Sequence, residues 1–179
     1  MIYLFLANGF EEIEALAPVD ILRRGGKEVC TVSITDKLLV TGARGIPVMA
    51  DKTIKDINPD DGEMFILPGG LPGADNLEAC KPLCDMIVKA NNQGKFVCAI
   101  CAAPKILGKL GIVNGKKATC YPGYEDTLTG AEIAGTGVAV DGNVVTANGM
   151  GSSIEFALAL LSLVSDNADK IAKGILYHG

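Results

Sequence analysis

Cys101 stands where an apolar run, 96–100, gives way to a stretch that opens with two alanines and Pro104. The run predicts a buried strand and 102–110 predicts a helix, because proline is tolerated in a first helical turn. A strand that turns directly into a helix crowds its own backbone, so the residues around a nucleophile placed there must be small. The pattern predicts that Cys101 is a nucleophile whose thiol pKa is lowered by the N–H groups of a helix N-terminus. The alternative is that Cys101 is one more small buried residue.

Two other kinds of cysteine chemistry fit this stretch less well. A redox pair of Cys98 with Cys101 would span three extended residues, which separate their alpha carbons by about 10 Å, whereas a disulfide needs less than about 7 Å. A metal centre would lack ligands, because the chain has 1 histidine, His178, and no second close pair of cysteines completes a site. The same scarcity disfavours a protease-type pair of cysteine and histidine. We therefore expect no metal and no other cofactor.

Three glutamates, Glu11, Glu12 and Glu14, open a predicted helix. For the first two we expect only a favourable interaction with the helix dipole. Glu14 lies close to the end of the strand predicted over 2–7, and we expect its side chain to cross the sheet edge toward Cys101. Burial and the neighbouring sulfur would raise the pKa of this carboxyl. In its protonated form it would donate to the sulfur or carry protons as a general acid and base.

Gly69 and Gly70 follow Pro68 at the end of another predicted strand, 64–67. Glycine leaves its backbone N–H accessible, so these two residues and the N–H of Ala102 are candidates for an oxyanion hole. The alternative is that Pro-Gly-Gly is only a tight turn. Parallel sheets bind ligands beyond the carboxyl ends of their strands. We therefore expect the glutamate, glycine and cysteine segments to meet in one site.

Short apolar runs alternate with longer helical periods along the chain, which is typical of a parallel sheet with helices on its faces. At 179 residues the chain is long enough for one full core, and 1–179 is predicted to be a single domain. We expect an α/β fold: a flavodoxin-like, doubly wound, mostly parallel sheet with helices on both faces. Further elements are predicted as hairpins over 38–50 and 138–149 and as helices over 11–24, 82–93, 153–165 and 167–177.

Charge and hydropathy narrow the possible partners. The formal net charge of −5 disfavours nucleic acid, whose phosphates attract basic surfaces. The apolar stretch "FALALLSLV" is about half the roughly 20 residues that a membrane span needs, so no membrane partner is expected. The opening "MIYLFLANG" lacks the basic region of a signal peptide, which makes the cytoplasm the expected compartment. In that compartment we expect the cysteines to be reduced.

Four segments resemble the ThiJ/PfpI superfamily, and most closely its parkinsonism-associated protein deglycase branch: "ANGFEEIEALAPVDILRRGG", "LPGGLPGADNL", "AICAAP" and "GMGSSIEFAL". The resemblance extends over essentially the whole chain, and the first three segments match in both residue and spacing. It implies a flavodoxin-like sandwich. It also implies a homodimer in which the helix after the first strand lies at the interface.

The resemblance further implies roles for individual residues. Cys101 would be the reactive, oxidation-prone cysteine, and Glu14 the carboxyl that hydrogen-bonds it. The residues implied to supply backbone N–H groups to an oxyanion or oxidised sulfur are Gly70 and Ala102, and those implied to contact anions near the dimer interface are Arg24 and Arg44.

This chain departs from the pattern at three places. Tyr121 precedes Pro122 where the branch often has histidine, so an assisting histidine is absent. Asn148 stands where the branch has arginine, which makes the expected pocket less cationic. Ala102 stands where the protease-like members have histidine directly after the cysteine, so proteolysis is the least favoured activity.

Two classes of function are compatible with these residues. In the first, the chain is a glyoxalase-like or deglycase-like enzyme that acts on small reactive carbonyl compounds, methylglyoxal or its adducts, with Cys101 as nucleophile and Glu14 as proton carrier. In the second, it is a non-catalytic sensor of oxidative stress, in which Cys101 is oxidised to a sulfinate. A role in thiazole or thiamine synthesis is suggested only by the superfamily's label.

Overall fold

A central sheet of seven strands organises the computed structural model, which describes residues 1–178. The strand order is β10-β11-β7-β6-β1-β2-β5. Only β10 and β11 pair antiparallel, and the other neighbours are parallel. The bounds are β1 Ile2–Leu6, β2 Val29–Ser33, β5 Lys52–Thr53, β6 Met64–Leu67, β7 Phe96–Ile100, β10 Val138–Asp141 and β11 Val144–Ala147. The predicted α/β class with a mostly parallel sheet is confirmed.

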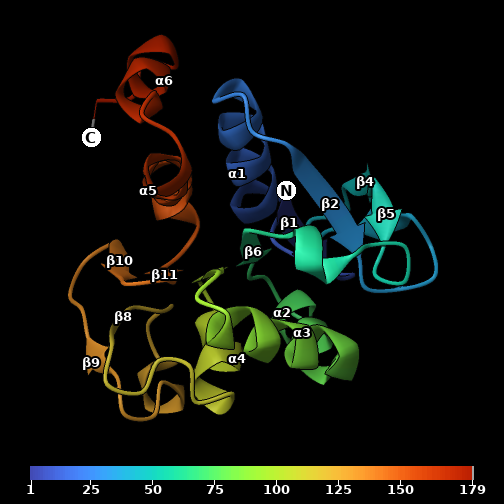
Figure 1. Cartoon of the computed structure of the whole chain (residues 1–179). Coiled ribbons are helices and arrows are strands. Elements are labelled where there is room, and N and C mark those ends of the chain that lie inside the picture. The colour runs from blue at the N-terminus through green and yellow to red at the C-terminus, as the bar shows by residue number, and fades with distance from the viewer. Residues whose placement is uncertain (179) are drawn as a thin grey trace.

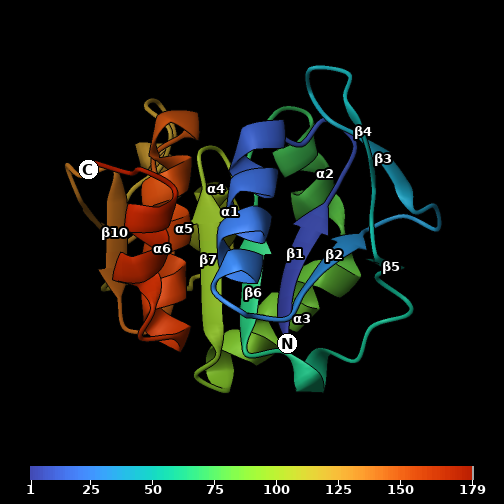
Figure 2. The same ribbon diagram turned by 90° about the horizontal axis from the view of Figure 1, so that it is seen from above.

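Helices cover both faces of this sheet (Figures 1 and 2). One face carries the helices α1, α5 and α6, and the other carries α2, α3 and α4. The bounds are α1 Glu12–Arg24, α2 Gly73–Ala79, α3 Lys81–Asn92, α4 Pro104–Lys109, α5 Ser153–Val164 and α6 Ala168–Gly174. Short 3-10 turns lie at Pro59–Asp61, Glu125–Thr127 and Met150–Ser152.

The two faces have separate hydrophobic cores, and this explains why the strands are apolar at every position. In β1, Leu4 packs into the core beneath α1 and α5. Its neighbour Phe5 points the other way, into the core that contains Leu77 of α2 and Ile87 of α3. Successive strand residues face opposite sides, so a sheet covered on both sides needs continuous apolar runs.

Two small additions flank the sheet. A hairpin of β3 (Leu39–Thr41) and β4 (Pro47–Met49) pairs antiparallel, as the alternation around its glycines predicts. A second pair, β8 (Lys117–Ala118) with β9 (Glu132–Ile133), is parallel. The hairpin predicted over 138–149 is confirmed as β10 and β11, and Gly142 adopts φ 61° in its turn.

The local structure differs from the sequence-based expectations around three helices. The helix after Cys101 begins at Pro104 and not at Ala102, because residues 101–103 form a turn. The helix α2 was not predicted. Before α5, the hydroxyl of Ser152 donates to the side-chain oxygen of Asn148 at 2.8 Å and does not cap the helix.

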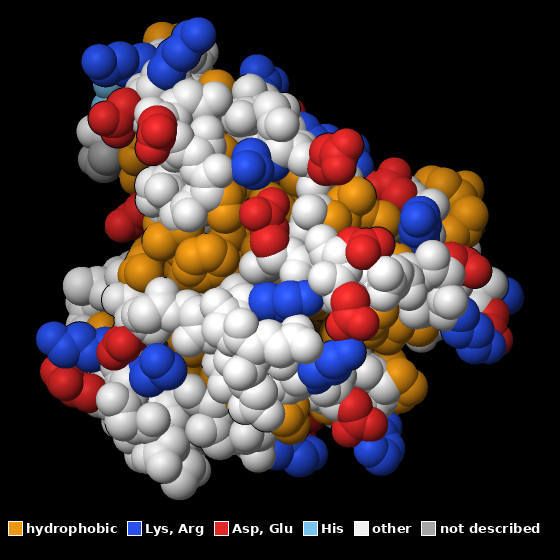
Figure 3. Space-filling model, in the orientation of Figure 1, with side chains coloured by type: hydrophobic (Ala, Val, Ile, Leu, Met, Phe, Trp, Pro, Cys, Tyr) orange, Lys and Arg blue, Asp and Glu red, His pale blue; other side chains and the backbone are white. Residues whose placement is uncertain are grey.

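The surface carries charged side chains of both signs, with hydrophobic side chains exposed between them on the face seen in Figure 3. Within residues 1–178, no helix combines the length and the apolar character that crossing a bilayer requires.

Candidate active site

Cys101 occupies a strained turn at the carboxyl end of β7. Its φ is 64°, a left-handed conformation that is uncommon for a residue with a side chain. The turn is held from both sides, because the N–H of Cys101 donates to the carbonyl of Ala147 at 2.8 Å and its carbonyl accepts from the N–H of Tyr121 at 2.8 Å. Backbone strain that persists in a well-bonded turn is typical of functional sites. The elbow predicted from the small neighbours is therefore present.

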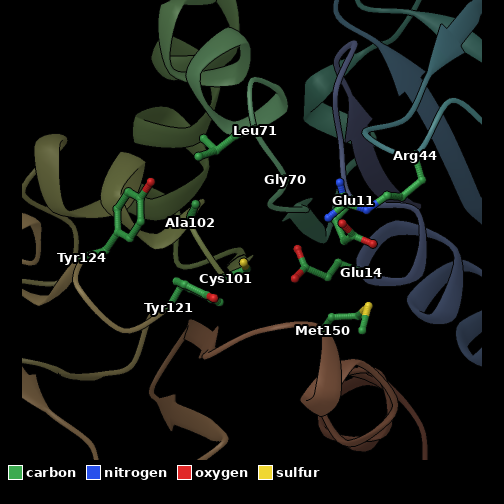
Figure 4. Close-up of a pocket in the computed structure, with 10 residues that line it drawn as sticks. All are labelled: Glu11, Glu14, Arg44, Gly70, Leu71, Cys101, Ala102, Tyr121, Tyr124 and Met150. Carbon is green, nitrogen blue, oxygen red and sulfur yellow. The ribbon is translucent and has the colours of Figure 1, made fainter.

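Glu14 reaches the same sheet edge from the first turns of α1, and it is almost fully buried, with 1% of its surface exposed. Its Oε2 accepts a hydrogen bond from the N–H of Gly69 at 3.0 Å. Its Oε1 has no partner of good hydrogen-bond geometry among residues 1–178. Figure 4 shows the carboxyl directed toward Cys101. In the structure, the side chains of Glu14 and Cys101 therefore approach each other as predicted.

The two groups influence each other's protonation. Burial raises the pKa of Glu14 to about 7, against the opposing effect of hydrogen bonds from Cys101 and Gly69. Burial, followed by the charge of Glu14, raises the pKa of the Cys101 thiol to about 12. The lowered thiol pKa expected from a helix N-terminus was wrong, because the thiol is buried beside the charge of Glu14 and α4 begins three residues later. At neutral pH the sulfur therefore holds its proton, and a thiolate forms when the Glu14 carboxylate accepts that proton.

Backbone N–H groups oppose part of this rise in the pKa of the Cys101 thiol. Those of Ala102 and Gly70 bond the Cys101 sulfur and lower its pKa. Gly70 adopts φ 85°, and a Cβ on it would lie 2.3 Å from the backbone nitrogen of Glu11. The prediction that Gly69 belongs to the same set of donors was wrong, because its N–H is already bonded to Glu14. The N–H groups available to a developing negative charge are therefore those of Gly70 and Ala102.

Gly69 contributes instead through its missing side chain. A Cβ added there would lie 2.6 Å from Oε2 of Glu14 and 2.7 Å from the Cβ of Cys101. We expect Gly69→Ala to lower the free energy of unfolding by about 1–3 kcal/mol, the usual cost of overpacking, and to separate the two side chains. Denaturant unfolding would measure the effect. Gly135→Ala is the control, because no atom lies within 4 Å of that Cβ position; equal stability of the two variants would contradict the close approach.

A cavity of about 420 Å³ opens onto the Cys101 sulfur (Figure 4). Its lining residues are Glu11, Glu14, Arg44, Gly70, Leu71, Cys101, Ala102, Tyr121, Tyr124 and Met150. Sequence reasoning did not find Leu71, Tyr124 or Met150, because loops whose residues show no periodicity bring them to the cavity. Half-exposed Tyr121 lies beside Cys101, where its position after the sheet edge was the only signal.

The two arginines proposed for anion contacts have different positions. Arg44 lines the cavity. Arg24 lies ten residues after Glu14 in the same helix, which places it about 15 Å farther along the axis. There it forms an exposed ion pair with Asp20 at 2.7 Å. The structure thus brings Cys101, Glu14 and Arg44 to one cavity and leaves Arg24 outside it.

Comparison with known proteins agrees with this geometry. The family model described as "DJ-1/PfpI family" matches residues 1–163. The chain belongs to the DJ-1/PfpI family. Its membership confirms the resemblance that the four sequence segments indicate.

Individual members of the DJ-1/PfpI family show the same relationship. The chain is 39% identical over 158 residues to "Protein DJ-1 homolog B" of Arabidopsis thaliana, covering 87% of this chain but only 36% of that longer protein. It is 36% identical over 146 residues to "Deglycase PfpI" of Pyrococcus furiosus, with 80% of this chain and 87% of the relative covered. The solved structure "Toxoplasma gondii DJ-1, oxidized" superposes with a TM-score of 0.95 at 36% identity, covering 99% of this chain and 98% of that one.

Proposed function

We propose that this protein is a cysteine-dependent enzyme that converts small reactive carbonyl compounds, such as methylglyoxal or its adducts, in a glyoxalase-like or deglycase-like reaction. One observation carries the proposal: the buried Glu14 carboxyl, with a pKa of about 7, lies beside the Cys101 sulfur at the floor of an open cavity. A group that titrates near neutral pH is suited to accept and return protons. The deglycase name of a relative supports the same class of reaction.

The chemistry begins when the Glu14 carboxylate accepts the proton of the Cys101 thiol. With that proton on Glu14, the Cys101 thiolate attacks the aldehyde carbon of methylglyoxal, and a carbon–sulfur bond forms. The carbonyl oxygen takes the proton from Glu14, which gives a hemithioacetal and leaves Glu14 as a carboxylate. While negative charge develops on this oxygen, the N–H groups of Gly70 and Ala102 stabilise it.

The second half of the reaction moves hydrogen along the substrate. The Glu14 carboxylate removes the proton from the attacked carbon and delivers it to the neighbouring carbon, while the hydroxyl proton passes to the neighbouring oxygen. The product is a thioester of lactate on Cys101. Water then hydrolyses this thioester, so that methylglyoxal and one water give lactate and the thiol is restored.

A second candidate function has its own supporting observation. The N–H groups of Gly70 and Ala102 already bond the sulfur, and a protonated Glu14 would donate to an oxygen attached to it. Two equivalents of peroxide would convert the thiol to a sulfinic acid and release two waters. The similar structure from Toxoplasma gondii is that of an oxidized DJ-1. In this role the chain would be a sensor without turnover.

The protein's assembly and compartment are also proposals. We propose a homodimer that buries the outer side of α1, because Ile13 and Leu16 on this helix are 51% and 37% exposed. Apolar side chains that share one helix face are typical of a protein contact. We place the protein in the cytoplasm, where its cysteines, unpaired in the structure, would remain reduced.

The number of turnovers per protein molecule separates the two candidate functions. We expect incubation with excess methylglyoxal to yield many equivalents of lactate per Cys101, as measured by chromatography of the products. In parallel, peptide mass spectrometry would count the sulfinate formed with peroxide. Lactate limited to one equivalent or less, together with complete sulfinate formation at low peroxide, would reject the enzyme and favour the sensor.

A further inference from the structure

Glu12 is buried at the start of α1 but takes no part in the chemistry proposed for Glu14. Only 4% of its surface is exposed, so the expectation that it merely interacts with the helix dipole was wrong. Its Oε1 accepts a hydrogen bond from the N–H of Arg44 at 2.8 Å and lies 3.4 Å from the N–H of Ile46. Its Oε2 is buried without a hydrogen-bond partner among the described residues. A carboxyl oxygen left in that state costs stability, so its retention calls for a functional reason.

The contact joins α1 to the tip of the β3–β4 hairpin. Additional backbone bonds fix this tip, including that from the N–H of Ala43 to the carbonyl of Phe10 at 2.8 Å. The tip also fits closely around the carboxyl, because a Cβ on Gly42 would lie 2.3 Å from Oε1 of Glu12. The hairpin can therefore occupy this position only with glycine at 42 and a side chain of this length at 12.

The hairpin tip carries the single basic side chain among the cavity-lining residues, that of Arg44. Arg23 and Arg24 form ion pairs with aspartates, whereas Arg44 forms none within residues 1–178. Figure 4 shows its guanidinium directed toward the cavity on the side of Glu11. A cation that lines the same cavity as a reactive sulfur favours ligands that carry negative charge.

We infer that Glu12 is a positioning residue, which holds Arg44 at the mouth of the Cys101 cavity and thereby makes the site favour electrophiles that carry a negative charge. This inference deepens the proposed function, because it specifies the substrate class as carbonyl compounds with an adjoining anionic group, such as α-oxo acids. Glu12 itself touches neither the sulfur nor the substrate. It acts through the backbone N–H of Arg44, from which it accepts a hydrogen bond.

Two alkylating reagents test the inference without any turnover. Iodoacetate and iodoacetamide react with a thiol in the same way, but only iodoacetate is charged. The ratio of their rates at Cys101, measured by peptide mass spectrometry at low ionic strength, reports the preference for an anion. We expect Arg44→Gln to lower this ratio about threefold to tenfold, as the loss of one nearby charge would. Arg24→Gln is the matched control and should leave the ratio unchanged.

Two variants of Glu12 distinguish the effect of its side-chain length from the effect of its charge. Glu12→Asp keeps the charge but is too short to hold the N–H of Arg44, so the ratio should fall toward that of Arg44→Gln. Glu12→Gln loses the charge but keeps an oxygen that can accept from the same N–H, so the ratio should stay at or above the wild-type value. If Glu12 acted only as a through-space charge, Glu12→Asp would leave the ratio unchanged, and that result would overturn the inference.

Gly42→Ala provides a second way to break the contact, in case Glu12→Asp does not fold. Both Glu12 and Arg44 are present in this variant, and we expect the ratio to fall because the new Cβ displaces the carboxyl. A ratio at the wild-type value in a folded Gly42→Ala would also overturn the inference. For the substrates themselves, Glu12→Asp should raise the KM for glyoxylate more than the KM for methylglyoxal. Absence of carbonyl turnover would reject the proposed function alone, since the reagent ratio does not depend on it.

Discussion

Replacing Cys101 with alanine is expected to lower kcat/KM for methylglyoxal by about a thousandfold or more, because the covalent hemithioacetal cannot form without the sulfur. The remaining groups, Glu14 and the N–H groups of Gly70 and Ala102, are arranged around that sulfur and have no alternative nucleophile beside them among the described residues. The assay is the rate of lactate formation at several methylglyoxal concentrations. A serine at the same position should be nearly as inactive, because its hydroxyl is a far weaker acid than a thiol.

The control for this variant must retain the protein's other thiols, since any exposed thiol adds reversibly to an aldehyde. Cys80→Ser serves this purpose, because Cys80 is half-buried in the segment that joins α2 to α3, away from the Cys101 cavity. We expect Cys80→Ser to keep wild-type activity. If Cys101→Ala retained more than about a tenth of the wild-type rate, methylglyoxal loss would have to proceed without the proposed nucleophile.

Glu14→Gln is expected to stabilise the fold at alkaline pH while abolishing turnover. Burial raises the pKa of Glu14 to about 7 from its ordinary value of 4.5. Between these two values the folded protein holds a proton that the unfolded chain has released, so the free energy of unfolding decreases as the pH rises through this window. The full penalty applies above about pH 7 and amounts to about 3 kcal/mol, at 1.36 kcal/mol per pKa unit.

The measurement is denaturant unfolding of wild type and Glu14→Gln at a series of pH values from about 4.5 to 8.5. The advantage of the variant should grow by about 3 kcal/mol across this range, since glutamine has no proton to lose. Glu28→Gln, which changes an exposed carboxylate, is the matched control and should show no such trend. A stability difference that is independent of pH would show that Glu14 is not the group that ionises at the sheet edge.

We also expect Glu14→Gln to lose turnover, because an amide can donate a hydrogen bond but cannot carry a proton between carbons. A gain in stability with a loss of activity is the pattern expected where a site retains an unfavourably buried group for its chemistry. The strained φ of Cys101 and the close approach at Gly69 belong to the same pattern.

Several features of this protein follow from local sequence alone. The apolar runs of β1, β6 and β7 predict the buried parallel strands, because only a sheet covered on both faces needs apolar residues at successive positions. A strand that turns immediately crowds its own backbone and needs small residues there, so the small neighbours of Cys101 predict its position at the elbow. Since parallel strands end at one edge, the same reasoning predicts that Glu14 and the glycines near Pro68 meet Cys101 there.

Other features depend on contacts between distant segments, and no local pattern reports them. The helix α2 has fewer than two full turns and begins at Pro72-Gly73, so it shows no readable period and is held by the burial of Ala74 and Leu77. The direction of the thiol pKa depends on burial and on Glu14, which belongs to a distant segment of the chain. Which arginine reaches the cavity depends on the docking of the β3–β4 hairpin onto Glu12, a contact between segments about 30 residues apart. The sequence therefore predicts the nucleophile and the meeting of the strand ends, whereas the protonation and charge of the cavity arise only when the folded chain desolvates these groups together.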